Sequence, residues 1–333
     1  MNVISLSCCT LGFCAGIVAL AGCGAFPQAQ ADTPIGATDA TRQNRAHLRD
    51  AAQDRTWMAP DAKNDNLLYV SDLGSNDVYV YSYPRGALKG TLTGFEGAHG
   101  ECVDKRGDVF ITETRGQRIL EYAHGGTSPI ARLKDPGYYP LGCAIDSRTG
   151  NLAVTNDYTG TGAGNVSIYK HAKGKPKGYA DSTIEFYSYC SYDNKGNLYF
   201  DGSDVHGAFK FAELSPRSHT FTNITLNQTI DEPGGVQWDG NDVAVGDQGA
   251  GYSGSTVYEF AISESSGTLM GTTPLTGSAA VEQFWIQHKR VIGGSHDSGI
   301  GNVRYWHYPP GGPPTKTISG LVEPIGAVVS PAK

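Results

Sequence analysis

The chain has 333 residues, a formal charge of −7 at neutral pH and only 18% charged side chains. This acidic balance argues against a nucleic-acid partner, because phosphate binding requires a basic surface. Tyrosine and glycine are abundant, with 18 and 44 residues, and they favour strands and tight turns respectively. The composition therefore predicts an all-β fold.

The N-terminal segment has the features of an export signal. Residues 1–22 contain no charged side chain and end in an apolar run that is short for a membrane span. Leu20-Ala21-Gly22-Cys23 resembles the cleavage box of bacterial lipoproteins. This resemblance implies that residues 1–22 are removed, that Cys23 is lipidated, and that Gly24 directs the protein to the outer membrane. The alternative is ordinary secretion into the periplasm or beyond, with cleavage after Ala31.

Residues 23–64 follow as the lipidated cysteine and a polar tether rich in Ala, Asp, Gln and Thr. Such a composition buries little apolar surface, so residues 24–38 are expected to be flexible. Residues 39–53 have the pattern of a short helix with Asp39 or Thr41 as N-cap, although its apolar face is thin.

From residue 65 onward a pattern of short strands recurs. Leu67–Asp72 alternates, a Gly-Ser-Asn-Asp turn follows, and Val78–Tyr81 alternates again, which predicts a hairpin. The second half of this hairpin returns as tetrads that end in an aromatic residue: Val78–Tyr81, Ile119–Tyr122, Val166–Tyr169, Ala208–Phe211, Val257–Phe260 and Val303–Trp306. The spacing ranges from 41 residues (Tyr81 to Tyr122) to 49 (Phe211 to Phe260), which is typical of propeller blades.

Each unit also has an inner segment that ends in Asp and an outer segment that follows a Gly or Pro turn, so each reads as four strands. The first unit lacks its inner segment, and residues 323–331, EPIGAVVSP, have the missing form. The sequence therefore predicts a six-bladed β-propeller with four-stranded blades over residues 65–333. In it the C-terminal strand pairs with Leu67–Asp72, and this closure leaves no exposed sheet edge.

The motif GCAIDSRTGNLAVTND, followed by GNVSIY, resembles the repeat of NHL/SMP-type six-bladed propellers. Tyr139-Pro140-Leu141-Gly142 matches the start of that repeat, and residues 231–235 nearly match it. The whole chain is also similar to uncharacterised bacterial propeller lipoproteins. The resemblance implies the fold and carries over no activity, because one fold hosts many functions.

Ligands of propellers usually lie over the central channel, on the face that carries the loops between second and third strands. The sequence places acidic and aromatic residues in these loops and in those that enter the inner strands. The candidates are His99, Glu101, Glu113, Arg115, Tyr139, Asp157, Tyr189, Asp204, His206, Asp247, His296 and Asp297, with Tyr158, Glu282 and Gln283 nearby. Carboxylates suit Ca²⁺, and aromatics with polar neighbours suit a glycan or a peptide. The simpler interpretation is that these residues form turns and cap strand ends.

Gluconolactonase-type propellers resemble this fold and hold a metal ion in the channel with a Glu/Asn/Asp set. By that resemblance Glu101, Asn156, Asp201 and Asp247 would form a divalent-cation site, although the local motifs of that family are absent.

Three cysteines fall on inner strands of consecutive units. Cys143 and Cys190 occupy matched positions, three residues before Asp146 and Asp193, whereas Cys102 lies two before Asp104. An exported protein meets oxidising conditions, so the first expectation is a Cys143–Cys190 disulfide. The alternative is three buried thiols, since no spacing typical of a zinc site accompanies them.

These observations favour a lipid-anchored, monomeric, non-catalytic propeller of the cell envelope that binds a protein or glycan and needs no cofactor. A Ca²⁺-dependent hydrolase or lactonase of the gluconolactonase type is the alternative. A redox or cofactor-binding propeller is the third hypothesis.

Ring closure by the chain end gives a direct test. Deletion of the residues after Val322 should lower the melting temperature of the whole domain, because the first blade loses its inner strand. Thermal unfolding of the truncated protein measures this, and an unchanged melting temperature would contradict the closure.

Overall fold

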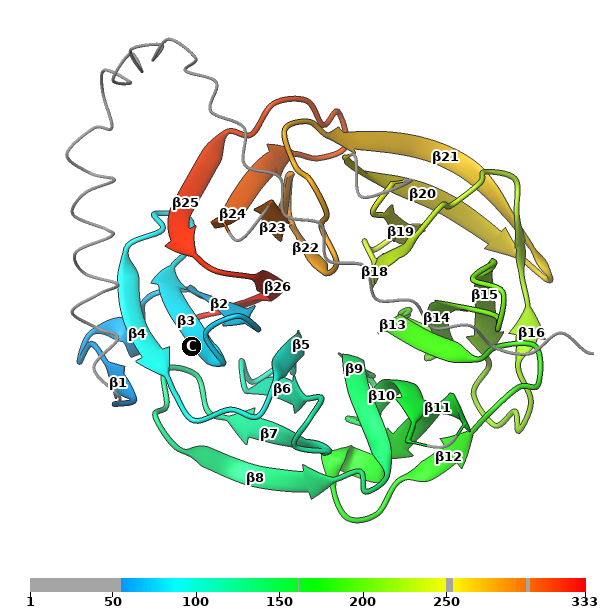
Figure 1. The fold of residues 1–333 in the computed structure, drawn as a ribbon, viewed down its shortest axis with the longest axis horizontal. Coiled ribbons are helices and arrows are strands. Elements are labelled where there is room, and N and C mark those ends of the chain that lie inside the picture. The colour runs from blue at the N-terminus through cyan, green and yellow to red at the C-terminus, as the bar shows by residue number, and fades with distance from the viewer. Residues whose placement is uncertain (1–54, 161, 250–253, 298–299) are drawn as a thin grey trace, which may run out of the picture. The chain divides into compact units, whose positions relative to one another are not determined.

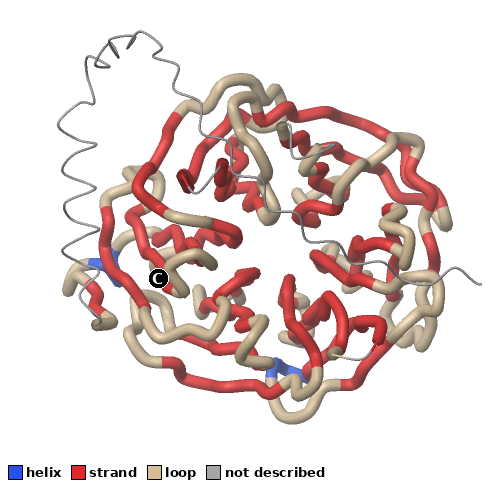
Figure 2. The backbone as a smooth tube through the Cα atoms, viewed as in Figure 1, coloured by secondary structure: helices blue, strands red, loops and turns tan. Residues whose placement is uncertain are grey.

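The computed structural model describes residues 55–160, 162–249, 254–297 and 300–333. Cys23, both expected cleavage sites and the helical pattern over residues 39–53 lie outside this range. Nearly every described element is a strand, and the two short 3₁₀ helices are Ala62–Asn64 and Lys170–Ala172 (Figure 2). No described helix has the length and apolar character needed to cross a membrane.

The described strands form six sheets arranged around a common axis (Figure 1). From the inner to the outer strand, the first three blades are β26 (Pro324–Ser330), β2 (Leu67–Asp72), β3 (Asp77–Ser82) and β4 (Leu88–Leu92) in blade 1; β5 (Ala98–Val103), β6 (Val109–Glu113), β7 (Arg118–Tyr122) and β8 (Pro129–Lys134) in blade 2; and β9 (Tyr138–Ile145), β10 (Leu152–Thr159), β11 (Gly162–Tyr169) and β12 (Lys177–Tyr179) in blade 3.

The other three blades follow the same order. They are β13 (Phe186–Tyr192), β14 (Leu198–Ser203), β15 (Phe209–Leu214) and β16 (Thr222–Asn223) in blade 4; β18 (Pro233–Trp238), β19 (Val243–Asp247), β20 (Ser255–Ser263) and β21 (Ser266–Leu275) in blade 5; and β22 (Phe284–Gln287), β23 (Arg290–Asp297), β24 (Ile300–His307) and β25 (Lys316–Leu321) in blade 6. The expected six-bladed fold with four-stranded blades is confirmed.

The predicted closure of blade 1 is also confirmed. Strand β26 pairs antiparallel with β2, with Leu67 opposite Ser330 and Asp72 opposite Pro324. The Asp72 carboxylate accepts hydrogen bonds from the backbone N–H groups of Val322 and Glu323, at 2.8 and 2.9 Å. The first and last strands of the domain therefore share one sheet.

Two short strands extend the expected four-strand pattern. Strand β1 (Trp57–Met58) pairs with β4 at the outer edge of blade 1. The propeller thus begins before residue 65, within the segment expected to be tether. Strand β17 (Thr225–Leu226) runs parallel to β21 in blade 5, directly after β16 of blade 4. This segment links the outer edges of two neighbouring blades.

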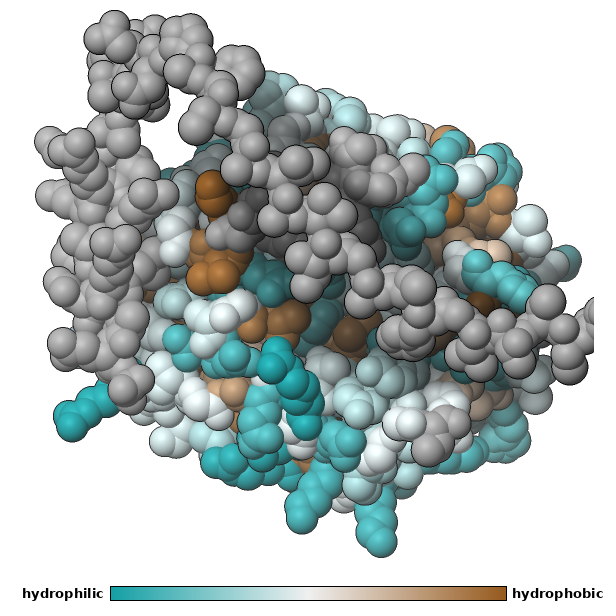
Figure 3. Space-filling view, in the orientation of Figure 1, coloured by the Kyte–Doolittle hydropathy of each residue, from teal (hydrophilic) through white to brown (hydrophobic). Residues whose placement is uncertain are grey.

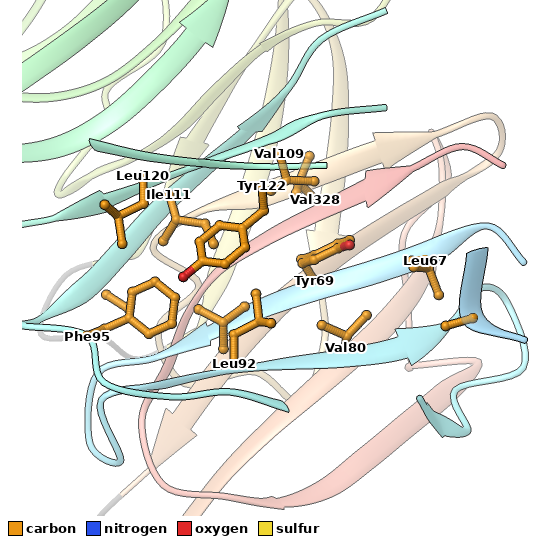
Figure 4. Packing of buried hydrophobic residues seen from close by; sticks show 13 residues of the cluster. Leu67, Tyr69, Val80, Leu92, Phe95, Val109, Ile111, Leu120, Tyr122 and Val328 are labelled. Atoms are coloured by element: carbon orange, nitrogen blue, oxygen red, sulfur yellow. The ribbon is translucent and has the colours of Figure 1, made fainter. Parts of the chain in front are cut away.

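The core lies between the blades, because each sheet buries both of its faces against its neighbours. One cluster joins blades 1 and 2, with Leu67, Tyr69 and Val80 on one side and Val109 and Ile111 on the other (Figure 4). Strands β2 and β6 are buried along their whole length, which explains their nearly continuous apolar sequence. Burial of side chains on this scale dominates the stability of the fold.

A hydroxyl group on the second strand connects neighbouring inner strands. Thr112 of β6 donates to the carbonyl of Leu141 at 2.7 Å and accepts from the Gly100 N–H at 2.8 Å. Thr155 repeats this one blade later, toward Ser188 and Gly142. The inner strands approach closely here.

Ser71 makes the same pair of bonds in blade 1, donating to the His99 carbonyl and accepting from the Gly326 N–H. A Cβ on Gly100 would lie 2.2 Å from the Leu141 carbonyl oxygen, so this close approach requires glycine on the inner strand.

The expected Cys143–Cys190 disulfide is wrong. Cys102 and Cys143 are bonded instead, with 5.6 Å between their Cα atoms, and Cys190 is a buried free thiol. Cys143 faces blade 2, and Cys190 packs in the cluster between blades 3 and 4. Matched positions point in the same direction around the ring and cannot meet, whereas Cys102 is displaced by one residue and faces forward onto Cys143.

Asp201 occupies the position in blade 4 that hydroxyl residues occupy in blades 1–3. One carboxylate oxygen accepts the Tyr189 N–H at 2.8 Å, as the hydroxyls accept from their own inner strands. The other oxygen is buried without a hydrogen-bond partner. Burial raises the pKa of Asp201 well above its ordinary value. Burial therefore favours the protonated carboxyl of Asp201 in the folded protein.

This inference predicts a stability effect that depends on pH. A raised folded-state pKa means that the stabilisation is complete below the unfolded pKa and is lost as pH rises toward the folded value. Asp201→Asn removes the titration and keeps a donor. The variant should be more stable than wild type at pH 7–8 by about 1–3 kcal/mol, and the difference should shrink toward pH 4. Denaturant unfolding at several pH values measures it.

Asp201→Thr restores the residue type of blades 2 and 3 and serves as a second variant. A pH-independent difference between Asp201→Asn and wild type would show that Asp201 is ionised in the folded protein.

Candidate functional site

The inner strands surround a narrow central cavity of about 160 Å³. It is lined from five of the blades by residues of β5, β9, β13, β18 and β22, including Glu101, Trp238 and Trp285. Figure 3 shows hydrophobic residues near the middle of the visible face and hydrophilic residues around them. We therefore expect a ligand to bind where loops surround the opening of this cavity.

Three polar side chains from different blades meet at one mouth of the channel. His99 is on β5, Tyr189 is on β13, and Glu282 precedes β22. The Tyr189 hydroxyl donates to Glu282 Oε2 at 3.2 Å, and His99 Nε2 lies 3.6 Å from the same oxygen. The His99 and Tyr189 rings lie 6.5 Å apart. We call His99, Tyr189 and Glu282 the channel-mouth cluster.

Burial controls the protonation of this cluster. Desolvation lowers the pKa of His99, and the Glu282 carboxylate opposes that effect only in part. His99 is therefore neutral at pH 7, and its buried Nδ1 has no hydrogen-bond partner. Desolvation also raises the pKa of Tyr189, which remains protonated. The nearby Asp157 is half-buried, and burial raises its pKa to about 6.

Glu101 lies deeper, in the wall of the central cavity. Its side chain is fully buried, neither carboxylate oxygen has a hydrogen-bond partner, and desolvation raises its pKa well above the ordinary value. The Gln283 side chain bonds both main-chain groups of the same residue, at 2.9 Å to the N–H and 2.7 Å to the carbonyl. This amide ties blade 6 to blade 2.

Gln237 of β18 makes an equivalent two-point contact with the Ile286 backbone, at 2.6 and 3.1 Å. The two glutamines fix three inner strands relative to one another. They make the channel wall rigid beneath the mouth.

An aromatic group lies beside the mouth on blades 3 and 4. Tyr139 and Tyr158 stack with ring centroids 4.5 Å apart, and Phe186 meets Tyr158 edge-on at 6.4 Å. Tyr158 remains 39% exposed, which leaves a flat apolar surface open to solvent. We call Tyr139, Tyr158 and Phe186 the aromatic platform.

Other predicted residues stabilise loops. Glu113 is fully buried, pairs with Arg118 and accepts from the Glu96 N–H. Asp247 accepts from the backbone N–H groups that lead into β18. Both carboxylates therefore cap loops at strand ends.

Asp204 accepts from two N–H groups of its own turn and pairs with Lys210. The Lys210 hydrogen bond lowers the pKa of Asp204 to about 2. Arg115 and His206 are exposed. His296 and Asp297 end β23, and their side chains are outside the described structure.

The residues expected to bind a metal do not assemble. Asn156 donates to Asp135 and Asn165, away from the channel, and Asp247 caps its own loop. In the described ranges, no three His, Cys, Asp or Glu side chains are grouped so that they could hold a metal ion.

Two features of the site are not indicated by the sequence. They are the contact of Phe186 with Tyr158 and the hydrogen bonds of Gln237 with Ile286. The only available signal was their place at or near the ends of inner strands, which does not show that side chains from separate blades meet.

Comparison with known proteins identifies the fold. No family model and no curated protein matches the chain. Among solved structures, one from a nidogen/laminin complex has a TM-score of 0.66 at 12% identity, covering 80% of this chain and 99% of that one. TolB from Acinetobacter baumannii has a TM-score of 0.61 at 12% identity, covering 88% and 72%.

Virginiamycin B lyase from Staphylococcus aureus has a TM-score of 0.51 at 15% identity, covering 71% of this chain and 75% of the lyase. At such identities the likeness extends to the fold alone, and these proteins differ in role. The chain is a six-bladed β-propeller.

Proposed function

We propose that the protein is an exported, lipid-anchored propeller of the cell envelope that binds a protein or glycan at the mouth of its channel. The main support for this proposal is the exposed aromatic platform beside the polar channel-mouth cluster. Flat aromatic faces next to a few placed polar groups are typical of sites that recognise sugars or peptide side chains.

The contacts support recognition. Tyr158 offers a solvent-facing ring held by two aromatic neighbours, so little side-chain entropy is lost on binding. The Glu282 side chain of the channel-mouth cluster is 23% exposed, so its carboxylate can accept hydrogen bonds from a ligand beside the platform. The nidogen/laminin structure belongs to a protein complex, which is compatible with a protein ligand here.

Membrane attachment rests on Cys23 and its resemblance to lipoproteins. The Cys23→Ser variant should appear in the soluble fraction rather than with membranes, which fractionation and acyl labelling would measure. This readout is independent of ligand binding.

The binding site can be tested with an oligosaccharide array and a displayed peptide library. For any ligand found, Tyr139→Ala with Tyr158→Ala should weaken affinity by about tenfold or more, because interface aromatics contribute strongly. The matched control is Ile130→Ala with Met270→Ala, since both residues are exposed on outer strands.

The proposed binding face would be contradicted if both variant pairs lost the same affinity for the ligand, or if only the control pair lost affinity. Unchanged affinity in the tyrosine pair would do the same.

A Ca²⁺-dependent hydrolase is the alternative, and Glu101 favours it, because two unbonded carboxylate oxygens lie in the channel wall. Under the leading proposal, added Ca²⁺ leaves the melting temperature unchanged and lactones are not hydrolysed. A rise in melting temperature that disappears in Glu101→Gln, together with lactone hydrolysis, would favour the alternative.

A further inference from the structure

Two neighbouring pockets lie at the end of blades 2–4 opposite the channel-mouth cluster. One, of about 320 Å³, lies between the first turns of blades 2 and 3. The other, of about 400 Å³, lies one blade further along. Asp146, Arg148 and Thr149 line both. We call the two pockets together the basic groove. The cations that line it are Lys105, Arg106, Arg148, Lys173 and Arg217.

Neighbouring carboxylates neutralise only part of the positive charge of the basic groove. Within the described ranges, four of its five cations form no ion pair, whereas Arg106 pairs with Asp104, Asp108 and Glu121. The acidic residues that line the groove form hydrogen bonds within their own turns. Asp146 accepts from the Arg148 N–H and from the Thr149 hydroxyl. Asp104 accepts backbone N–H groups and pairs with Arg106. The groove is therefore locally cationic in a chain whose net charge is −7.

Hydrogen bonds of His171 hold the loop that carries Lys173 in place. The His171 N–H donates to Asn151 Oδ1 at 2.9 Å, and His171 Nδ1 lies 2.8 Å from the Thr149 carbonyl oxygen. His171 and Ala172 have positive φ angles of 52° and 51°, which non-glycine residues adopt only where their surroundings impose them. This loop ends at the exposed Lys173.

Arg148 lines both pockets. A Cβ on Gly196, in the first turn of blade 4, would lie 2.9 Å from Arg148 Nη1. The guanidinium therefore extends from blade 3 across the turn of blade 4. It is exposed, so its donors are open to a bidentate carboxylate or phosphate.

We propose that the basic groove binds an acidic glycan whose successive charged sugars occupy the two pockets and share Arg148. Hydroxyl groups of Ser147, Thr149, Ser215 and Ser218 line the same pockets, and the Tyr179 ring lines the second. Such a mixture of cation, hydroxyl and ring suits a charged sugar better than an isolated anion. The groove lies apart from the channel mouth and does not depend on the function proposed there.

The shape of the surface separates a glycan from other polyanions. The cations line concave pockets, which a planar lipid surface does not enter.

In the test, the protein with residues 1–333 is titrated with oligogalacturonate, a carboxylate glycan, and binding is measured by calorimetry. Binding should weaken between about 20 mM and about 500 mM NaCl, because salt screens exposed charges. Arg148→Gln with Lys173→Gln should lower affinity about tenfold or more. The matched control, Lys289→Gln with Arg290→Gln, removes the same charge from an exposed turn of blade 6 and should leave affinity within about twofold.

Fully methyl-esterified oligogalacturonate should not bind. Its binding, or an equal loss of affinity in both variant pairs, would overturn the proposal. Phosphatidylglycerol vesicles and single-stranded DNA are further titrants, and tighter binding of either than of oligogalacturonate would overturn it in favour of that class. No oligogalacturonate binding at low salt would also overturn it.

Discussion

The structure depends on the close approach of inner strands from neighbouring blades. At this point the hydroxyls of Ser71, Thr112 and Thr155 bond to two blades at once. The glycines opposite them leave space for the next strand, as the 2.2 Å clash of a Cβ on Gly100 shows. The short strand module can therefore be repeated around an axis without leaving buried backbone groups unsatisfied. The channel-mouth cluster is a consequence, because His99, Tyr189 and Glu282 meet only if the inner strands converge.

The two faces of the domain have different electrostatic character. At the channel mouth, burial lowers the pKa of His99 and raises those of Tyr189 and Asp157, so the site holds neutral groups at pH 7 apart from its carboxylates. At the other end of the strands, four of the five cations that line the basic groove form no ion pair among the described residues. The channel mouth thus combines carboxylates with neutral polar and aromatic groups, whereas the basic groove favours anions.

The sequence allowed the fold to be predicted well, because strand alternation, the aromatic of each third strand and the displaced inner segment at residues 323–331 are local signals. The disulfide could not be predicted from matched spacing, because neighbouring sheets face each other and only a one-residue offset, as at Cys102, brings two cysteines together. The site was predicted in part. His99, Tyr139 and Tyr189 lie where expected, whereas Glu113, Asp204 and Asp247 cap loops. Contacts between blades, such as that of Gln237 with Ile286, leave no periodic signal in the chain.

The pairing of β26 with β2 has a consequence for the order of folding. Strand β26, which follows all other strands of the domain in the chain, supplies the inner strand of the first blade. Blades 2–6 contain all their strands before β26 is synthesised, but the ring cannot be completed until β26 leaves the ribosome. Until then β2 has an open inner edge that could pair with another chain. The nascent domain is therefore most prone to misassociation at its first blade, until β26 has paired with β2.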